Sequence, residues 1–259
     1  MSRVVLVSGG ASGIGAALAT AHAMAGDTVV VADLHPRDPS HVLLDVRDRE
    51  AFAAVARAVV DRHGRIDVFY DNAGIAVAGS IEELAPEHWD SAIDVNLRGV
   101  IHGVEAVYPV MRAQGHGHIV ITASLAGLIP VPLLGPYTVT KHAVVALARV
   151  LRLEAAASGV RVSALCPAFV QTPMLTNINP GTARTRANRM GATLAGRAQR
   201  RALRPEQVAA IVLAALPRNP EIIVAPRVLG RLGALAERLA PGVVRRVGTH
   251  EIGRYRRLG

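Results

Sequence analysis

The chain has 259 residues, of which 51% are hydrophobic and 19% are charged, with a formal net charge of +9. This composition excludes extended disorder, and a chain of this length can bury a large core without disulfides or metal clips. A single cysteine, Cys166, excludes an intrachain disulfide and a multi-cysteine metal site, so we expect a cytoplasmic protein. The apolar pattern predicts neither a signal peptide nor a membrane span.

Short apolar runs rich in β-branched residues alternate along the chain with longer stretches of helical pattern. Strands are expected at 3–7, 28–32, 42–44, 66–70, 118–122, 160–165 and 221–225. Helices are expected around 13–25, 49–63, 86–112, 137–158 and 205–216. Strict alternation implies right-handed crossovers, and continuously apolar strands imply burial on both faces. The sequence therefore predicts one α/β domain, with a Rossmann-like, doubly wound parallel sheet of about seven strands.

A glycine-rich segment follows the first predicted strand and leads into the first helix. Gly9, Gly13 and Gly15 give it the spacing G-x-x-x-G-x-G, which permits a tight turn and close approach of a pyrophosphate to the helix N-terminus. Asp33 follows the second strand, where a carboxylate accepts hydrogen bonds from the adenosine ribose and repels a 2′-phosphate. The pattern favours NAD over NADP, unless the loop carrying Arg37 folds back to bind a phosphate.

Lysine occurs once among the 29 basic residues, at Lys141, four residues after Tyr137. Residues four apart share one face of a helix. A phenol is a poor base at neutral pH, and a nearby ammonium together with an oxidised nicotinamide ring would lower its pKa. A compact ammonium reaches the tyrosine and a ribose hydroxyl in a geometry that a guanidinium does not offer. The spacing therefore places a phenol and an ammonium on one helix face, an arrangement that suits acid/base chemistry.

Four motifs together resemble the short-chain dehydrogenase/reductase family over roughly residues 3–225: Gly13-Ile14-Gly15, Asn72-Ala73-Gly74, Ser124, and Tyr137 with Lys141. The resemblance implies alcohol/ketone oxidoreduction with Tyr137 as general acid/base and Lys141 on the nicotinamide ribose. It also implies that Ser124 bonds the substrate oxygen and that Asn96 supports a proton relay. The cofactor-binding residues that it implies are Gly9, Ser12, Gly13, Ile14, Gly15, Asp33, Asp45, Val46, Asn72, Ala73, Gly74, Tyr137, Lys141, Pro167, Val170 and Thr172.

Two positions depart from the family pattern. Asp71 stands where an asparagine usually precedes Asn72, which leaves the hydrogen bonding on the adenine side open. Ala168 replaces the usual glycine after Pro167, so that turn loses conformational freedom.

The single cysteine and the ten histidines show no metal-ligand spacing, so no metal site is expected. Cys166 is expected to be an inert thiol at a strand end. His116 and His118, at the start of a strand, are expected to be solvated.

Apolar residues follow the fifth and sixth predicted strands. Residues 125–136 read LAGLIPVPLLGP, and Phe169, Met174 and Leu175 follow the sixth strand. These residues suit a pocket for a hydrophobic secondary alcohol or ketone such as a steroid, a terpenoid or another lipid. They are equally suited to packing against the core or another subunit.

Residues 181–204 carry seven arginines and no acidic residue, where the family has its substrate-covering region. A basic lid would attract a phosphorylated acyl carrier, so the alternative function is a 3-oxoacyl-thioester reductase that uses NADPH. A solvated helix is the other interpretation of this segment.

Residues 226–259 extend beyond the expected catalytic domain, 1–225. Val228, Leu232, Leu235 and Leu239 lie opposite three arginines, which predicts a basic amphipathic helix ended by Pro241-Gly242. Such a helix suits an anionic membrane surface, a cover over the substrate pocket, or a contact with another subunit. We expect a homodimer or homotetramer, with weak membrane-surface association of this extension as an open alternative.

The positive charge is concentrated at the C-terminal end. Residues 1–180 carry 13 basic and 16 acidic residues, whereas residues 181–259 carry 16 and 4. This excess leaves one non-enzyme alternative, a nucleotide-sensing or nucleic-acid-binding protein on the same fold. The predicted catalytic set and an aromatic content of 3% argue against it, so no nucleic-acid partner is expected.

Overall fold

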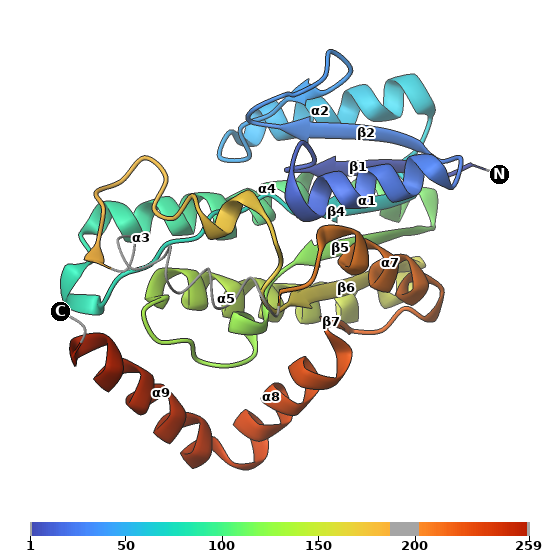
Figure 1. The fold of residues 1–259 in the computed structure, drawn as a ribbon. Coiled ribbons are helices and arrows are strands. Elements are labelled where there is room, and N and C mark those ends of the chain that lie inside the picture. The colour runs from blue at the N-terminus through green and yellow to red at the C-terminus, as the bar shows by residue number, and fades with distance from the viewer. Residues whose placement is uncertain (1, 187–201, 258–259) are drawn as a thin grey trace.

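The computed structural model describes residues 2–186 and 202–257, and its centre is a parallel sheet in the order β3-β2-β1-β4-β5-β6-β7 (Figure 1). All residues of β1, β4 and β5 are buried, as expected for continuously apolar strands covered on both faces. The predicted doubly wound sheet is confirmed. The strands are β1 (Val4–Ser8), β2 (Thr28–Asp33), β3 (Val42–Leu43), β4 (Val68–Asp71), β5 (Gly117–Thr122), β6 (Val160–Pro167) and β7 (Ile222–Ala225).

Helices cover both faces of this sheet, and each face has its own apolar core. One core packs α2 (Arg49–His63), α4 (Gly99–Gln114) and α5 (Gly135–Ala155) against the sheet. The other packs α1 (Gly13–Met24) and α7 (Pro205–Ala215) against the opposite face. The predicted bounds of α2 are confirmed, because Asp48 caps its N-terminus by accepting from the backbone N–H of Ala51 and Gly64 ends it at φ 77°.

The long helix predicted over 86–112 is interrupted. The structure has α3 (Pro86–Ile93), a π-helical segment at Asp94–Arg98, and then α4. The wider π turn carries Asn96, whose buried side chain bonds to the backbone of Ile75. A π turn adds one residue to a helix and changes its hydrophobic period only slightly, so the sequence pattern does not reveal the interruption.

The C-terminal extension contains two helices. Helix α8 (Arg227–Leu239) ends near the predicted Pro241-Gly242, but the chain then enters α9 (Pro241–Arg257). The sequence predicts that Pro241-Gly242 ends a helix, but in the structure Pro241 is the first residue of α9. Proline is accommodated at the first helical position because the N–H that it lacks has no partner within the helix there. Within the described residues, no helix has the combined length and apolar character required to cross a membrane.

His118 contradicts the expectation of a solvated side chain. It lies in central strand β5, is buried, and its Nε2 is 3.0 Å from Ser163 Oγ. Burial lowers the pKa of His118 to about 3, so the ring is neutral. His116, two residues earlier, is exposed as expected.

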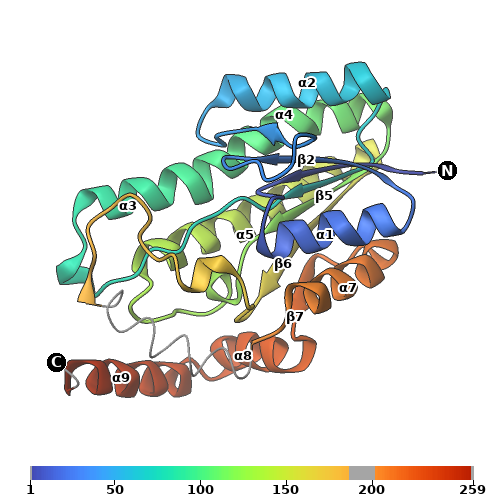
Figure 2. The ribbon, with the colours of Figure 1, turned by 45° about the horizontal axis from the view of Figure 1, so that its top comes forward.

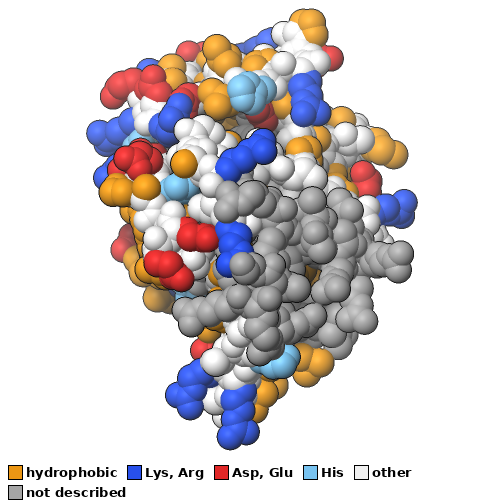
Figure 3. Space-filling model, turned by 60° about the vertical axis from the view of Figure 1, so that its left-hand side comes forward, with side chains coloured by type: hydrophobic (Ala, Val, Ile, Leu, Met, Phe, Trp, Pro, Cys, Tyr) orange, Lys and Arg blue, Asp and Glu red, His pale blue; other side chains and the backbone are white. Residues whose placement is uncertain are grey.

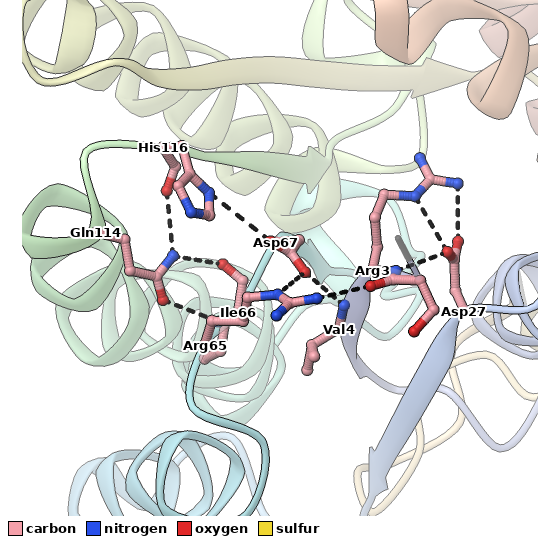
Figure 4. Close-up of polar contacts among 9 residues, drawn as sticks. Arg3, Val4, Asp27, Arg65, Ile66, Asp67, Gln114 and His116 are labelled. Atoms are coloured by element: carbon pink, nitrogen blue, oxygen red, sulfur yellow. Dashed lines mark hydrogen bonds and ion pairs between the residues drawn. The ribbon is translucent and has the colours of Figure 1, made fainter.

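Two carboxylates tie the amino ends of the strands together (Figure 4). Asp27 Oδ1 accepts from the backbone N–H of Arg3 at 2.9 Å, and Asp27 Oδ2 forms an ion pair with the Arg3 guanidinium at 2.8 Å. Asp67 accepts from the backbone N–H of Val4 at 2.6 Å and from Arg65 Nε at 2.8 Å. These contacts join β1 to β2 and β4 at the edge opposite the glycine-rich loop.

Candidate active site

Tyr137 and Lys141 lie on the first turns of α5. Lys141 Nζ is 5.7 Å from the centroid of the Tyr137 ring and donates to the carbonyl of Thr122 at 2.8 Å. The lysine side chain is buried, and burial lowers the pKa of Lys141 to about 8, opposed by the charge of Asp71. A buried ammonium therefore sits beside the phenol, as the spacing of four residues predicts.

The electrostatics of Tyr137 differ from the expectation. Burial raises the pKa of Tyr137 above its ordinary value, and a side-chain hydrogen bond with Ser124 only partly opposes that rise. Within the described part of the chain, Lys141 Nζ donates to the Thr122 carbonyl and not to the phenol. The chain's own groups thus keep Tyr137 protonated at neutral pH, the form that donates a proton to a carbonyl oxygen.

Ser124 follows β5 and caps a short 3₁₀ turn, Leu125–Gly127. Its Oγ accepts from the backbone N–H of Ala126 at 3.1 Å and lies 3.5 Å from the carbonyl oxygen of Pro167. This turn packs directly on α5, since a Cβ on Gly127 would lie 2.4 Å from the Lys141 carbonyl oxygen. That close approach brings the Ser124 hydroxyl to the Tyr137 phenol.

Asn96 connects the site to the loop that follows β4. Its Oδ1 accepts from the backbone N–H of Ile75 at 2.8 Å, and its Nδ2 donates to the Ile75 carbonyl at 3.0 Å. Its Nδ2 is also 3.4 Å from Thr140 Oγ1 on α5. A Cβ on Gly74 would lie 3.0 Å from Asn96 Oδ1 and 3.5 Å from Lys141 Nζ. The structure therefore brings together all four predicted catalytic residues.

The glycine-rich loop folds tightly against the loop after β4. Gly9 has φ 63°, and a Cβ there would lie 2.7 Å from Ala73 Cα. A Cβ on Gly15 would lie 2.2 Å from the carbonyl oxygen of Gly9 and 2.6 Å from Asn72 Nδ2. Asn72 Nδ2 donates to that same Gly9 carbonyl at 3.0 Å. The predicted cofactor residues of these two loops thus form one surface at the carboxyl ends of β1 and β4.

The predicted adenosine side gathers at the ends of β2 and β3. Asp33 Oδ2 accepts from the backbone N–H of Ala11 at 2.9 Å, which fixes the carboxylate against the glycine-rich loop. Asp45 is held by Arg47 at 2.6 Å, and hydrogen bonding from Arg47 lowers the pKa of Asp45. Val46 is buried against Gly99 at the start of α4. Among the described residues, Arg47 forms an ion pair with Asp45, whereas no arginine forms one with Asp33.

The segment after β6 closes the opposite side of the crevice. A Cβ on Gly13 would lie 3.0 Å from Thr172 Cγ2, so Thr172 touches the glycine-rich loop. Val170 is buried and pairs with Leu203 in an isolated bridge. Ser12 caps α1 through its backbone, and Ile14 is half-buried behind it. The arginine-rich segment predicted as a lid lies largely outside the described residues, which omit 187–201.

Cys166, the single cysteine of the chain, is buried near the end of β6. Burial raises the pKa of Cys166 to about 12, so the thiol is protonated and a poor nucleophile. Across residues 2–186 and 202–257, no three His, Cys, Asp or Glu side chains form a group that could hold a metal ion.

Sequence reasoning missed two polar residues that hold the site in place. Ser8 Oγ accepts from the backbone N–H of Asn72 at 2.9 Å, and Thr122 Oγ1 donates to Asn72 Oδ1 at 3.2 Å. The Thr122 carbonyl also receives Lys141 Nζ. A polar residue closing an otherwise apolar strand is the signal that would have found both.

The family model described as short chain dehydrogenase matches residues 3–183. Levodione reductase of Leifsonia aquatica is 35% identical over 192 residues, which cover 68% of this chain and 72% of that protein. The 3-oxoacyl-(acyl-carrier-protein) reductase FabG of Thermotoga maritima is 32% identical over 225 residues, covering 82% and 89%. A short-chain dehydrogenase/reductase of Burkholderia phymatum, crystallised with NAD, has a TM-score of 0.81 at 29% identity and covers 92% and 95%.

The doubly wound sheet and the clustered tyrosine, lysine and serine define an NAD(P)-binding oxidoreductase that acts on CH–OH groups. The chain belongs to the short-chain dehydrogenase/reductase family. Membership of this family decides against the nucleotide-sensing alternative.

Proposed function

We propose that this protein is an NAD-dependent oxidoreductase that interconverts a hydrophobic secondary alcohol and its ketone, such as a steroid, a terpenoid or another lipid-like compound. The observation that carries the proposal is the cluster of Ser124, Tyr137 and Lys141. The apolar segment 125–136 joins Ser124 to Tyr137 along the chain, and half-buried Met174 and Leu175 follow β6, so both suit the lining of a hydrophobic pocket. A relative named for levodione reduction supports a ketone substrate.

In carbonyl reduction, Tyr137 donates its phenolic proton to the substrate oxygen, while Ser124 Oγ hydrogen-bonds that oxygen and stabilises its developing charge. In alcohol oxidation, Tyr137 takes the hydroxyl proton back. Lys141 binds the nicotinamide ribose, and Asn96 orders the loop at Ile75 for a water-linked proton relay. When bound, the nicotinamide supplies or accepts the hydride.

The preference for NAD rests on Asp33. Its carboxylate is fixed at the end of β2 by the Ala11 and His35 N–H groups, where it would accept bonds from ribose hydroxyls. A 2′-phosphate at this position would meet like charge. The crystallised Burkholderia phymatum relative carries NAD, which agrees with this assignment.

A panel of cofactors and substrates tests the proposal directly. NAD(H) and NADP(H) are crossed with hydrophobic secondary alcohols, their ketones and an acetoacetyl thioester, and kcat/KM is measured for each pair. We expect the highest values with NAD(H) and the hydrophobic pair. Preferential use of NADPH with the thioester would instead establish the alternative, a 3-oxoacyl-thioester reductase, to which the FabG relative also points.

The role of Tyr137 is tested by Tyr137→Phe. We expect turnover to fall by about 10²–10⁴-fold or more, because the proton donor is lost, while NADH affinity measured by fluorescence stays close to wild type. Tyr108 is a half-buried residue of α4 outside the site, so Tyr108→Phe, which also removes one phenolic hydroxyl, serves as the matched control. Unchanged turnover of Tyr137→Phe would refute the assignment.

We also propose that the chain acts in the cytoplasm as a homodimer or homotetramer, with no nucleic-acid partner. Exposed Val139, Val150 and Leu153 lie along one face of α5, which suits a contact between copies. The solution mass from light scattering measures the assembly.

A further inference from the structure

Helices α8 and α9 leave a row of apolar side chains uncovered. Leu232, Leu235 and Leu239 on α8 are exposed by 57%, 50% and 71%, and Val243 and Val247 on α9 by 57% and 60%. Their spacings of three and four place them on one face of each helix. We call these five residues the apolar ridge. None of them belongs to either apolar core.

Basic residues accompany the apolar ridge. The stretch 226–259 carries eight arginines and two glutamates. Arg238 and Arg246 are exposed and directly adjacent in sequence to the ridge residues Leu239 and Val247, and basic side chains gather at the lower tip of the molecule (Figure 3). A helix with an apolar face bordered by arginines is typical of segments that lie in the plane of a membrane interface.

The other side of α9 faces the loops that lead into the site. A Cβ on Gly248 would lie 3.3 Å from Pro132 Cγ. Ile252 lines a hollow of about 330 Å³ with residues 79–82 and with Val131, Pro132, Leu133 and Gly135. Two residues after Gly135 the chain reaches Tyr137. Figure 2 shows α8 and α9 along the lower side of the molecule, next to these loops.

We propose that α8 and α9 dock this enzyme on an anionic lipid membrane through the apolar ridge and its arginines, with the substrate entrance held beside the bilayer. The inference rests on the proposed hydrophobic substrate, which would partition into lipid. Charge selects this occupant, because a second copy seated symmetrically on the ridge would oppose arginine to arginine. Anionic headgroups instead complement the arginines while the ridge enters the interface.

The test is flotation of the full chain with two kinds of vesicle. One kind mixes phosphatidylcholine with phosphatidylglycerol, and the other is phosphatidylcholine alone. We expect binding to the anionic vesicles, weakening as salt rises, and little binding to the neutral ones. Leu239→Glu is expected to reduce the anionic binding by about tenfold or more. The matched control Leu43→Glu replaces a leucine of similar exposure, 68%, on β3 and is expected to bind like wild type.

Equal flotation of wild type and Leu239→Glu would overturn the proposal. The proposal would also be overturned if wild type did not bind vesicles and Leu239→Glu had a lower solution mass than wild type. That result would identify the ridge as a contact between copies of the chain. Flotation does not depend on turnover, so failure of the docking is distinguishable from failure of the substrate assignment. Folding of each variant is verified by its affinity for NADH, because none of the ridge residues is among those assigned to cofactor binding.

Discussion

At the scale of single residues, Asp71 is the most unusual group near the site. It ends β4, is buried, and accepts one hydrogen bond from Ser8 Oγ at 3.2 Å. Its Oδ2 has no hydrogen-bond partner and lies where a Cβ on Gly103 would approach to 2.5 Å. Burial raises the pKa of Asp71 well above its ordinary value, opposed by the Ser8 bond and the charge of Lys141. The carboxyl therefore lies beneath α4, among Ser8, Gly103 and Phe52.

Because burial shifts the pKa of Asp71, the titration of this one carboxyl group makes the free energy of unfolding depend on pH. A raised folded-state pKa favours the protonated native form, so its stabilisation is complete below the unfolded pKa and is lost as pH rises toward the folded value. Asp71→Asn removes the titration. We expect the variant to be more stable than wild type at pH 8 by about 1–3 kcal/mol, with the difference vanishing near pH 4.

Denaturant unfolding at pH 4, 6 and 8 measures the effect, with exposed Asp61→Asn as the control. A difference between Asp71→Asn and wild type that stays constant across this range would show that Asp71 does not titrate in the folded protein. The Asp71→Asn substitution keeps the proposed catalytic residues Tyr137, Ser124 and Asn96.

At the scale of elements, the amino ends of the strands form a polar cluster remote from the chemistry. His22 of α1 joins Asp27 to Tyr70 of β4, with Nδ1 at 2.7 Å from Asp27 Oδ2 and Nε2 at 2.8 Å from the Tyr70 hydroxyl. Burial acts to raise the pKa of Asp27, but hydrogen bonds with His22 and Arg3 outweigh this effect and lower the pKa to about 2. The cluster thus joins α1, β1, β2 and β4 by bonds that need an ionised carboxylate.

Asp27→Asn is expected to lower the free energy of unfolding at pH 7 by about 1–2 kcal/mol, allowing for screening by solvent. A depressed pKa gives stability that is present above the unfolded value and lost as pH falls through the folded value of about 2. The deficit should therefore shrink below pH 4 in denaturant titrations. Exposed Asp90→Asn is the control, and kcat of Asp27→Asn should equal that of wild type. A deficit of equal size at pH 3 and pH 7 would contradict this account.

At the scale of the whole molecule, charge and chemistry occupy different parts of the chain. Residues 1–180, with more acidic than basic residues, hold Ser124, Tyr137, Lys141 and Asn96. The basic excess falls in 181–259, in which α8 and α9 run along one side of the fold. Among the side chains that the structure describes, neither apolar core has a member beyond Ala225, so the described part of the extension adds a surface to the molecule. The net charge of +9 is therefore the sum of −3 over residues 1–180, which carry 13 basic and 16 acidic residues, and +12 over residues 181–259, which carry 16 and 4.

The sequence alone determined the sheet, the order of its elements and the residues gathered at its carboxyl edge. Strand and helix periods are local properties, and parallel strands necessarily bring Gly9, Asn72 and Ser124 to one edge. Only the tertiary structure decided that Asn96 sits in a π turn, that His118 is buried, and that Pro241 opens a helix. It also decided that Asp71 and Lys141 share a desolvated region, because burial and pKa depend on neighbours distant in sequence.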